Sequence, residues 1–558
     1  MGSTIEQRID KLDYKDEEEG DPAPTPHLLF TATSTIASIG SEIEELVSEI
    51  CISDLICFQV LPSGIRKMCF FLLETCGFVK DNIFGNTGMK RLIDNIMSWN
   101  RLRTETIKVP MIQLDPSHIN VIKTPMEFYQ ALKILALKSK HRISISSLYI
   151  GTGPLETELI ECFEKAKQQN SNLDVNILLD YNRATREIRT NQNAIQSSKS
   201  LLMPFVDESR AGFKVNFFLT HTLSGWHRKF WRRPKWNELQ SLHHMKLYIF
   251  DDDIIISGAN LSDLYFTNRQ DRYVHIKKSP ILCDYFDQLI RTISKFSFQL
   301  KSNGNLELSD ECRWNPKIFS QRSEYVKNTR KAILSLNQRF KLSSMDDRLD
   351  ESLTIALPLL QMKTFNIIDE EEFTSYLFDM IESDQQLNLA TGYFNLVEKY
   401  QAKLLRNRSE RALTILMASE QANGFYNGKG ILKFIPLVYT YYVRKFVEKM
   451  RPNSNIIVRY YNKANWSFHA KGLWLDDVRN KQFITMIGST NLGYRSVFRD
   501  NESQIVIVTK DQELRRKFID EYAYLTKQSF VVSKNVPNEL PEIPRWVALI
   551  ARLFKSFF

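Results

Sequence analysis

The sequence predicts an α/β protein made of two similar halves, a duplicated pseudo-twofold pair with the active site at their interface. Three observations support this fold class. From residue 121 onward, helical patterns alternate with short apolar runs typical of strands. The same order of segments occurs again after residue 350. Each copy contains one motif of a histidine, a lysine two residues later and an aspartate five residues further on, so both halves carry the same side chains.

The first half is expected over residues 111–300, where four elements are easiest to recognise. Apolar positions recur at helical spacing in two stretches and run together in two others. We therefore expect a helix over 124–137, a strand over 142–151, a helix over 155–169 and a strand over 173–181.

The second half, expected over residues 351–535, repeats these strands. "LNLATGYFNL" matches "ISISSLYIGT" of the first half, and "LTILMAS" matches "VNILLDY". The separation drifts from 244 residues between the matching tyrosines to 225 residues between the motif histidines, which indicates an old duplication with altered loops. A charged helix, "SEYVKNTRKAILSLNQRF", is expected within the connector at 301–350.

Length and composition narrow the class of protein. The 558 residues exceed what one hydrophobic core usually organises, and no apolar run approaches the roughly 20 residues needed to span a bilayer. A net charge of +9 predicts an anionic partner such as nucleic acid, a phospholipid surface or a nucleotide. Seven cysteines without a CxxC pair argue against a disulfide framework and against a zinc site.

The two ends of the chain differ from the halves. Residues 1–26 are rich in acidic side chains, unlike a mitochondrial transit peptide, and predict a disordered or artificial leader. Residues 27–110 mix helical patterns with Gly and Asn breaks and predict an accessory helical segment. Residues 536–558 predict an amphipathic tail that associates with membranes.

The first motif, His244, Lys246 and Asp251, lies on a predicted strand and the turn after it. Residues two apart point to one face of a strand, so the imidazole and the ammonium project together. If the "DDD" turn centres on its middle residue, His244 falls opposite Asn260 and Lys246 opposite Gly258.

The second motif, His469, Lys471 and Asp476, allows the same construction. A longer turn places His469 opposite Asn491 and Lys471 opposite Ser489. The small partner residues would leave a pocket open for a phosphate. The aspartates of both motifs are counted with the catalytic set, but they lie near the turns, where anchoring or charge balance is more plausible than direct chemistry.

Two facing copies supply what phosphoryl transfer needs. Attack at phosphorus requires a nucleophile, positive charge for the equatorial oxygens and a proton-transfer group on the opposite side. One neutral imidazole can be the nucleophile and the other the acid and then the base, while the lysines and asparagines bind the oxygens. This chemistry requires no metal and no cofactor. A single motif would be just as consistent with an ordinary surface histidine and lysine, whereas two copies favour a site.

The paired motifs resemble those of the phospholipase D superfamily. The surrounding segments "SLYIGTGPLETELI", "HHMKLYIFDDDIIISGANLSDLYFTNRQDRY", "ATGYFNL", "ANGFYNGKG", "WSFHAKGLWL" and "IGSTNLGYRSV" are similar to the eukaryotic mitochondrial phosphatidylglycerophosphate synthases. The resemblance runs from about residue 110 to about residue 530 and does not obviously extend to the residues before it.

This resemblance implies transfer of a phosphatidyl group from CDP-diacylglycerol to glycerol 3-phosphate, with release of CMP. It implies a covalent intermediate with His244 as nucleophile and His469 as acid and base, although near-symmetry leaves the reverse assignment open. It also implies a peripheral protein on the matrix side of the mitochondrial inner membrane. No nucleic-acid partner is expected, and a homo-oligomer is left open.

An acceptor that carries its own phosphate needs further positively charged side chains to bind that phosphate. Arg183 and Arg186 lie in "DYNRATRE", which resembles the family's paired-arginine segment, and Arg269 and Arg272 lie in "NRQDRY". The alternative is that these arginines form structural ion pairs with nearby carboxylates.

Two segments are expected to rest on an anionic membrane surface. Residues 224–236 interleave aromatic and basic side chains, a pattern that also suits nucleic acid. The tail has a basic and an apolar helical face, and the alternative is that it packs on the core or on a second subunit. The expected membrane contacts are Trp226, Arg228, Lys229, Phe230, Trp231, Arg232, Arg233, Trp236, Arg545, Trp546, Arg552 and Lys555.

Three other functions share parts of this pattern. A nuclease or phosphodiesterase of the superfamily would share the motifs and the basic charge, but tyrosyl-DNA phosphodiesterases usually carry Asn where this chain has Asp251 and Asp476. Phosphatidylserine and cardiolipin synthases differ mainly in the acceptor alcohol. A lipid-binding pseudoenzyme is disfavoured because every motif residue is present.

Overall fold

The computed structural model describes most of the chain from residue 109 onward, and all described residues belong to one compact unit, Met89–Phe558. The predicted leader and nearly all of the accessory segment lie outside the described residues. The described positions are 96, 99–100, 109–189, 195–206, 212–220, 238, 240–343, 354–382, 385–406, 412–451, 454–532 and 542–558.

The first half is built on a nine-stranded sheet. Strands β3 and β4 are the two predicted from the sequence, and they pair in parallel as consecutive strands of an α/β unit do. The order across the sheet is β13 (Leu306–Leu308), β12 (Phe298–Leu300), β7 (Phe213–Phe218), β4 (Asp174–Asp180), β3 (Arg142–Ser147), β8 (Leu247–Phe250), β9 (Asp253–Ser257), β11 (Tyr273–Ile276) and β2 (Ile119–Ile122).

The second half has a sheet of the same design. From β23 to β14 its strands follow the order that β12 to β2 follow in the first sheet, so the predicted duplication is visible strand by strand. The order is β23 (Ser529–Val532), β18 (Ile456–Tyr461), β17 (Leu413–Ala418), β16 (Gln386–Thr391), β20 (Gly472–Asp477), β21 (Gln482–Gly488), β22 (Glu502–Thr509), β14 (Thr354–Met362) and β1 (Ile112–Leu114), with β15 (Ile367–Ile368) paired to β14.

The sheets differ from the expected boundaries of the halves at two places. Strand β1 falls within the range expected for the first half, yet it pairs with β14 of the second sheet. Strand β13 extends the first sheet beyond residue 300, into the range expected for the connector. The chain therefore exchanges a strand between the halves, which a boundary drawn from composition does not reveal.

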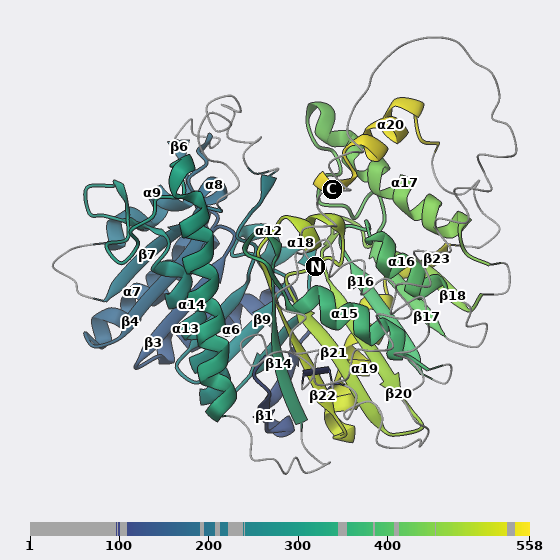
Figure 1. The fold of residues 1–558 in the computed structure, drawn as a ribbon, viewed down its shortest axis with the longest axis horizontal. Coiled ribbons are helices and arrows are strands. Elements are labelled where there is room, and N and C mark those ends of the chain that lie inside the picture. Colours follow the sequence, from purple (N-terminus) through teal and green to yellow (C-terminus); the bar gives the residue numbers. More distant parts are fainter. Residues whose placement is uncertain are drawn as a thin grey trace, which may run out of the picture. The chain divides into compact units, whose positions relative to one another are not determined.

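Helices cover the sheets (Figure 1), and the predicted ones are present as α6, α7 and the connector helix α14. Helix α6 starts where the sequence dictates, because Thr124 and Glu127 form a capping box around Pro125. The helices are α6 (Pro125–Lys138), α7 (Pro154–Gln169), α8 (Tyr181–Ala184), α9 (Ser198–Leu202), α12 (Asp263–Thr267), α13 (Pro280–Ser294), α14 (Arg322–Ser343), α15 (Asp369–Met380), α16 (Glu398–Leu405), α17 (Ile435–Glu448), α18 (Tyr494–Phe498), α19 (Gln512–Thr526) and α20 (Arg545–Leu553).

Three clusters of buried apolar side chains hold these layers. One lies between the first sheet and α6 and α7, with Phe128 at its centre, and a second lies between the second sheet and α15 to α17, with Phe373. The third includes Phe286 of α13 and Phe518 of α19 and combines side chains from both sheets. Because this cluster is common to both halves, it fixes them against each other, and β9 contacts β21 where they meet.

Among the residues that the structure describes, two short strand pairs stand apart from the two large sheets. Strands β5 (Ile188–Arg189) and β6 (Ile195–Gln196) pair antiparallel within the first half. Strands β10 (Arg269–Gln270) and β19 (Ser467–Phe468) pair in parallel, and they come from different halves. This second pair stands next to the motif histidine of the second half.

Candidate active site

Both motif histidines lie just before the hairpin of their half. His244 and Lys246 precede β8, and His469 and Lys471 lie between β19 and β20. The side chain of His244 is 13% exposed and that of His469 5%, while both lysines are buried. The four groups are therefore held in protein surroundings that weaken their contact with water.

The hairpin register differs from the prediction by one residue in both halves. In the first hairpin Phe250 faces Asp253, so the turn holds two residues. In the second Asp477 faces Gln482, so the turn holds four. A turn with an even number of residues centres between two positions, and the predictions had centred both turns on a residue. The predicted cross-strand partners of the histidines and lysines are consequently wrong by one position.

Backbone hydrogen bonds between the halves hold both histidines. The His469 N–H donates to the Gln270 carbonyl at 2.8 Å, beside the parallel pair of β10 and β19. The His244 N–H donates to the Asn501 carbonyl at 2.8 Å, beside a parallel bridge between His243 and Asn501. Each histidine is thus tied to a segment of the opposite half.

The residue after each of these bridging residues is acidic and contacts the imidazole. Glu502 Oε2 lies 2.8 Å from His244 Nδ1, and Asp271 Oδ2 lies 2.6 Å from His469 Nδ1. An Nδ1–H that donates to a carboxylate fixes the ring orientation and leaves Nε2 with its lone pair. Each half therefore orients the histidine of the other.

The lysines lie beside the imidazoles. Lys246 Nζ donates to the His244 carbonyl at 2.7 Å, and Lys471 Nζ donates to the His469 carbonyl at 2.8 Å. Lys471 Nζ is also 2.7 Å from His469 Nδ1, but that nitrogen donates to the carboxylate, so the ammonium lies against the ring without an acceptor there. A Cβ on Gly258 would lie 2.7 Å from Asp271 Oδ1 and 2.8 Å from Lys471 Nζ, so any larger residue there would displace both groups.

Burial and mutual charge set the ionisation of the site. Burial lowers the pKa of His244 below its ordinary value, although Glu502 opposes this. Burial, and next the charge of Lys471, hold the pKa of His469 well below its ordinary value, and Lys246 contributes to this from the other half. Both imidazoles are therefore neutral near neutral pH, as a nucleophile and a base require.

The two carboxyl groups shift in opposite directions. Burial raises the pKa of Asp271 to about 6, against the charge of Lys471. Burial also disfavours the charge of Glu502, but the interaction with His244, followed by Lys246, outweighs it and lowers the pKa of Glu502 to about 2. The two half-sites share a geometry and differ in their proton equilibria.

The motif aspartates contact other parts of the chain. Asp251 accepts backbone N–H groups from Lys140, His141 and Arg142 at 2.7 to 3.0 Å. Asp476 forms a two-point ion pair with Arg515 at 2.8 and 2.9 Å. These contacts are structural, in line with the anchoring role expected from their position near the turns.

Of the two amides expected to bind phosphate, Asn260 is linked to His469 through a tyrosine. Asn260 Nδ2 donates at 3.2 Å to the Tyr265 hydroxyl, which itself lies 3.2 Å from His469 Nε2. The buried Oδ1 atoms of Asn260 and Asn491 have no hydrogen-bond partner among the described residues. Ser489 Oγ is buried and accepts the Ser503 N–H at 3.1 Å, so it supports the strand beneath the site.

Three of the four expected arginines contact a carboxylate or an aromatic ring. Arg186 forms a two-point ion pair with Glu238 at 2.7 Å, and the Arg183 guanidinium stacks 4.2 Å from the centre of the Tyr149 ring. The Arg269 guanidinium lies 4.8 Å from the centre of the Tyr265 ring. The partner of Arg186 is a carboxylate that the sequence did not suggest.

Arg272 has a different role. It is fully buried and donates to both Glu521 oxygens at 2.9 Å, to Met486 O at 2.7 Å and to Thr485 Oγ1 at 2.8 Å. Its guanidinium also lies 3.8 Å from the centre of the Trp474 ring. Arg272 therefore connects the two halves structurally. This corrects the prediction that it binds the phosphate of the acceptor.

Several residues of the cleft were not singled out from the sequence. Glu502 is the most important, and a signal for it existed, because acidic residues stand eleven positions after Asn260 and after Asn491. Tyr393 meets His469 edge to face at 5.6 Å between ring centres. Arg495 adds a cation from the second half, which donates to Glu238 O at 2.5 Å.

The expected membrane segment at 224–236 lies outside the described residues. The tail forms α20, whose Val547 and Ala551 are buried against the second half. Its Arg552 donates to the Tyr441 hydroxyl at 2.7 Å, and Lys555 forms an ion pair with Glu398. The tail thus packs on the core, which was the alternative, and four apolar side chains stay exposed: Trp546 at 43%, Leu549 at 56%, Leu553 at 68% and Phe554 at 49%.

Duplicated halves that present two histidine and lysine pairs, with each histidine oriented by the opposite half, define a phosphotransfer enzyme of the phospholipase D type. A family model described as "Cardiolipin synthase, PLD-like domain" matches residues 377–525. The crystal structure of phosphatidylserine synthase from Haemophilus influenzae has the same fold, with a TM-score of 0.62, 19% identity, and coverage of 85% of this chain and 100% of that one.

Sequence relatives identify the family. The mitochondrial CDP-diacylglycerol–glycerol-3-phosphate 3-phosphatidyltransferase of Gallus gallus is 37% identical over 81% of this chain and 85% of its own length. The Homo sapiens protein of the same name is 35% identical over 81% of this chain and 84% of its own length. The chain belongs to this family of phosphatidyltransferases, and the predicted resemblance is confirmed.

Proposed function

We propose that this protein transfers the phosphatidyl group of CDP-diacylglycerol to glycerol 3-phosphate through a covalent phosphatidyl-histidine, as the first committed step toward phosphatidylglycerol and cardiolipin. The substrates are those in the names of the relatives. The observation that carries the mechanism is the pair of neutral imidazoles, each held at Nδ1 by a carboxylate of the opposite half.

In the first step, His244 Nε2 attacks the phosphorus that carries the diacylglycerol. An N–P bond forms while the P–O bond to CMP breaks, and CMP leaves as a phosphate anion that needs little help from an acid. Lys246, Lys471 and the amides of Asn260 and Asn491 bind the oxygens on which negative charge accumulates.

In the second step, His469 Nε2 takes the proton of a glycerol hydroxyl. The hydroxyl oxygen attacks phosphorus, the N–P bond breaks, and His244 is released with its electron pair. The assignment is supported by the larger exposure of His244 and by the Tyr265 hydroxyl, which already contacts His469 Nε2 at 3.2 Å. It is further supported by Asp271, whose pKa of about 6 suits a proton-transfer partner.

The phosphate of the acceptor is bound by Arg183, Arg186 and Arg269. The first two converge on Glu238, and burial lowers the pKa of Arg186, with the nearby charge of Arg183 acting in the same direction. Two cations around one carboxylate leave net positive charge for a dianion. This grouping supports selection of a phosphorylated alcohol over serine.

The protein works as a peripheral protein on a mitochondrial membrane, and the matrix face of the inner membrane is the proposed site. The names of the two relatives include the word mitochondrial. Among the described helices, none has both the length and the apolar character required to cross a bilayer. The exposed apolar side chains of α20 support contact with an anionic lipid surface.

A release assay tests the reaction. CMP release from CDP-diacylglycerol is measured with glycerol 3-phosphate, with serine or without acceptor, and His244→Ala, which lacks the proposed nucleophile, serves as the inactive control. The expected result is release that depends on glycerol 3-phosphate. Equal release with serine or with water would overturn the proposed acceptor.

A further inference from the structure

The Tyr265 hydroxyl contacts the nitrogen of His469 that the second transfer step uses. His469 Nδ1 donates to Asp271, so Nε2 keeps its lone pair, and the Tyr265 hydroxyl donates to that lone pair at 3.2 Å. Burial raises the pKa of Tyr265 above its ordinary value, so the hydroxyl keeps its proton near neutral pH. The base of the second step is therefore already engaged in this structure.

Lys471 does not take the place of Tyr265 at Nε2. Its Nζ lies 3.3 Å from His469 Nε2 and only 2.7 Å from Nδ1. A group on the lone pair of Nε2 would be nearer to Nε2 than to Nδ1, because that lone pair points away from the ring. Among the described residues, Tyr265 is thus the group that meets this lone pair.

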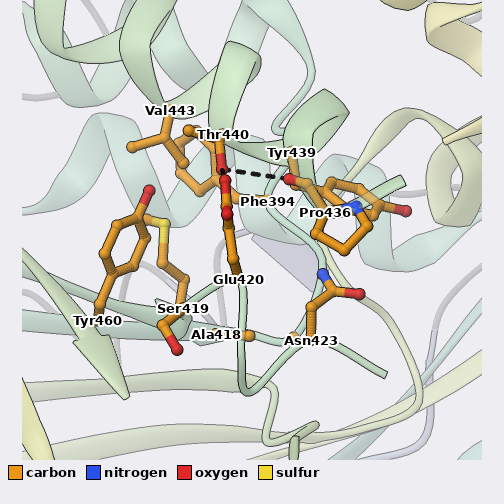
Figure 2. Close-up of a pocket in the computed structure, with 12 residues that line it drawn as sticks. Phe394, Ala418, Ser419, Glu420, Asn423, Pro436, Tyr439, Thr440, Val443 and Tyr460 are labelled. Carbon is orange, nitrogen blue, oxygen red and sulfur yellow. Dashed lines mark hydrogen bonds between the residues drawn. The ribbon is translucent and has the colours of Figure 1, made fainter. Parts of the chain in front are cut away.

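Aromatic side chains close another side of the imidazole. Tyr393 meets the His469 ring edge to face at 5.6 Å between ring centres, and Tyr439 lies 5.3 Å from Tyr393 by the same measure. Figure 2 shows the hollow that Tyr439 lines, and it has room for about one water molecule. Neither glycerol 3-phosphate nor a nucleotide fits in that hollow, so this side admits no acceptor.

Tyr265 also contacts a cation that is assigned to the acceptor phosphate. The Arg269 guanidinium lies 4.8 Å from the centre of the Tyr265 ring. Arg269 Nε donates to Ser467 Oγ at 2.9 Å, so both of these contacts are with neutral groups. A phosphate dianion attracts a guanidinium more strongly than an aromatic ring or a hydroxyl does. Phosphate bound at Arg269 therefore draws the guanidinium away from Tyr265.

The amide next to the Tyr265 hydroxyl has an unused acceptor atom. Asn260 Nδ2 donates to that hydroxyl at 3.2 Å, while the buried Oδ1 of Asn260 has no hydrogen-bond partner among the described residues. A buried acceptor without a donor is costly, so its presence points to a ligand. Glycerol 3-phosphate has two free hydroxyls, which can donate to His469 Nε2 and to Asn260 Oδ1 once Tyr265 has moved.

We propose that Tyr265 is a gate that keeps water from the base, and that the phosphate of the acceptor opens this gate through Arg269; the inference rests on the proposed phosphatidyl transfer. With the gate closed, a water molecule near the phosphatidyl-histidine finds no free base for its proton, so hydrolysis to phosphatidate is slow. With the gate open, the acceptor hydroxyl gives its proton to His469 Nε2, its oxygen bonds to phosphorus, and the N–P bond to His244 breaks.

Product analysis with labelled CDP-diacylglycerol tests the gate. Phosphatidate and phosphatidylglycerophosphate are measured with and without glycerol 3-phosphate, on the full chain and on Tyr265→Phe, which keeps the ring and loses the hydroxyl. We expect phosphatidate release without acceptor to rise by about tenfold or more in Tyr265→Phe. Transfer to the acceptor should stay within about threefold, the worth of one hydrogen bond. Loss of transfer without a gain in hydrolysis would make Tyr265 a proton relay and overturn the gate.

Tyr393→Phe is the matched control. The Tyr393 ring also meets His469 edge to face, and in the described part of the chain its hydroxyl makes no hydrogen bond to that imidazole. Phosphatidate release should therefore be as low in Tyr393→Phe as in the full chain. Thermal melting shows whether each variant is folded. An equal rise in both variants would mean that the loss of any nearby hydroxyl admits water, against a specific gate at Tyr265.

Ethyl phosphate tests the link to Arg269, because it carries a phosphate and no hydroxyl. It should raise phosphatidate release by the full chain severalfold and leave that of Tyr265→Phe unchanged. No rise in the full chain would overturn the inference, even if the chain makes phosphatidylglycerophosphate. Both expected results in a chain that makes phosphatidate but no phosphatidylglycerophosphate would uphold the gate and remove the proposed acceptor. A chain that forms neither product would overturn both proposals.

Discussion

The two half-sites share a backbone plan and differ in their acids. Each histidine donates its backbone N–H to a residue of the opposite half, and the next residue of that half is the carboxylate on Nδ1. Glu502 stays ionised next to His244, whereas Asp271 has a pKa raised by burial to about 6 and lies 3.6 Å from Lys471. The duplication has thus preserved the geometry of the two half-sites, but their carboxyl groups differ. Glu502 carries a fixed negative charge, whereas Asp271 can exchange protons near neutral pH.

The largest effect should come from removing the histidines, which separates the two steps. In His469→Ala the first step can still occur and the second is blocked, so radiolabelled phosphatidyl should stay on the protein. In His244→Ala no label should attach. Turnover should fall in both by on the order of 10⁴-fold. Label retained only in His244→Ala would reverse the roles, and label in neither would remove the covalent intermediate.

The carboxylates should give stability profiles of opposite slope. The pKa of Glu502 is lowered from 4.5 to about 2, so the unfolded chain binds more protons in that window, and the stability present above about pH 4.5 is lost as pH falls. The pKa of Asp271 is raised from 3.8 to about 6, so the folded chain binds more protons, and stability falls as pH rises through that window.

Denaturant unfolding between pH 3 and pH 7 measures both slopes. Glu502→Gln should flatten the acid side of the plot of unfolding free energy against pH. It should also lower the free energy of unfolding at pH 7 by roughly 3 kcal/mol, at 1.36 kcal/mol for each pKa unit. Asp271→Asn should flatten the opposite slope between about pH 4 and about pH 6. If both variants changed the slope in the same direction, the two half-sites would not differ as described.

Much of this architecture could be predicted because it is local or repeated. The alternation of helices and strands along the chain and the motif pairs follow from patterns within each half, and the duplication doubles each signal. Glu502 was missed because its partner His244 is 258 residues away in sequence, and the repeated acidic residue eleven positions after each motif asparagine does not by itself show which histidine it contacts. Arg272 was misassigned because a buried strut and a ligand-binding arginine look alike in sequence, and only the contact with Glu521 distinguishes them.

Gly258 offers a smaller and more local test of the comparison. It precedes Asn260 by two residues, as Ser489 precedes Asn491, yet only the first half needs a glycine there. Gly258→Ala would place a methyl group 2.7 Å from Asp271 Oδ1 and 2.8 Å from Lys471 Nζ and push both groups aside. We expect kcat to fall by about tenfold to a hundredfold, as a displacement of about 1 Å can cause, with little change in the KM for glycerol 3-phosphate.

Ser489→Ala is the matched control for that variant, because it removes a hydroxyl and adds no atom. Its effect on kcat should be a few-fold, about the worth of one hydrogen bond to the backbone. Thermal melting would show whether either protein is unfolded. An equal loss of kcat in both variants would mean that the two positions serve the same purpose, against the asymmetry described here.

Variants of the tail should have the smallest effect on catalysis. They distinguish a tail that contacts the membrane from a tail that only packs on the protein core. Leu549 and Leu553 are 56% and 68% exposed, while Val547 and Ala551 of the same helix are buried. Replacing both leucines by glutamine should therefore leave folding intact. It should weaken flotation on anionic liposomes by at least about tenfold, since a buried leucine contributes roughly 1.5–3 kcal/mol.

Ile457→Gln is the control for the tail variant, because Ile457 is also an exposed apolar side chain of the second half, at 40%, but lies on β18. It should not change flotation. Turnover on a short-chain donor in detergent should be the same for all three proteins, since the exposed leucines contact none of the catalytic residues. If the double variant floated as well as the unmodified chain, α20 would hold the second half together through Val547 and Ala551 alone, and the membrane contact would have to lie elsewhere.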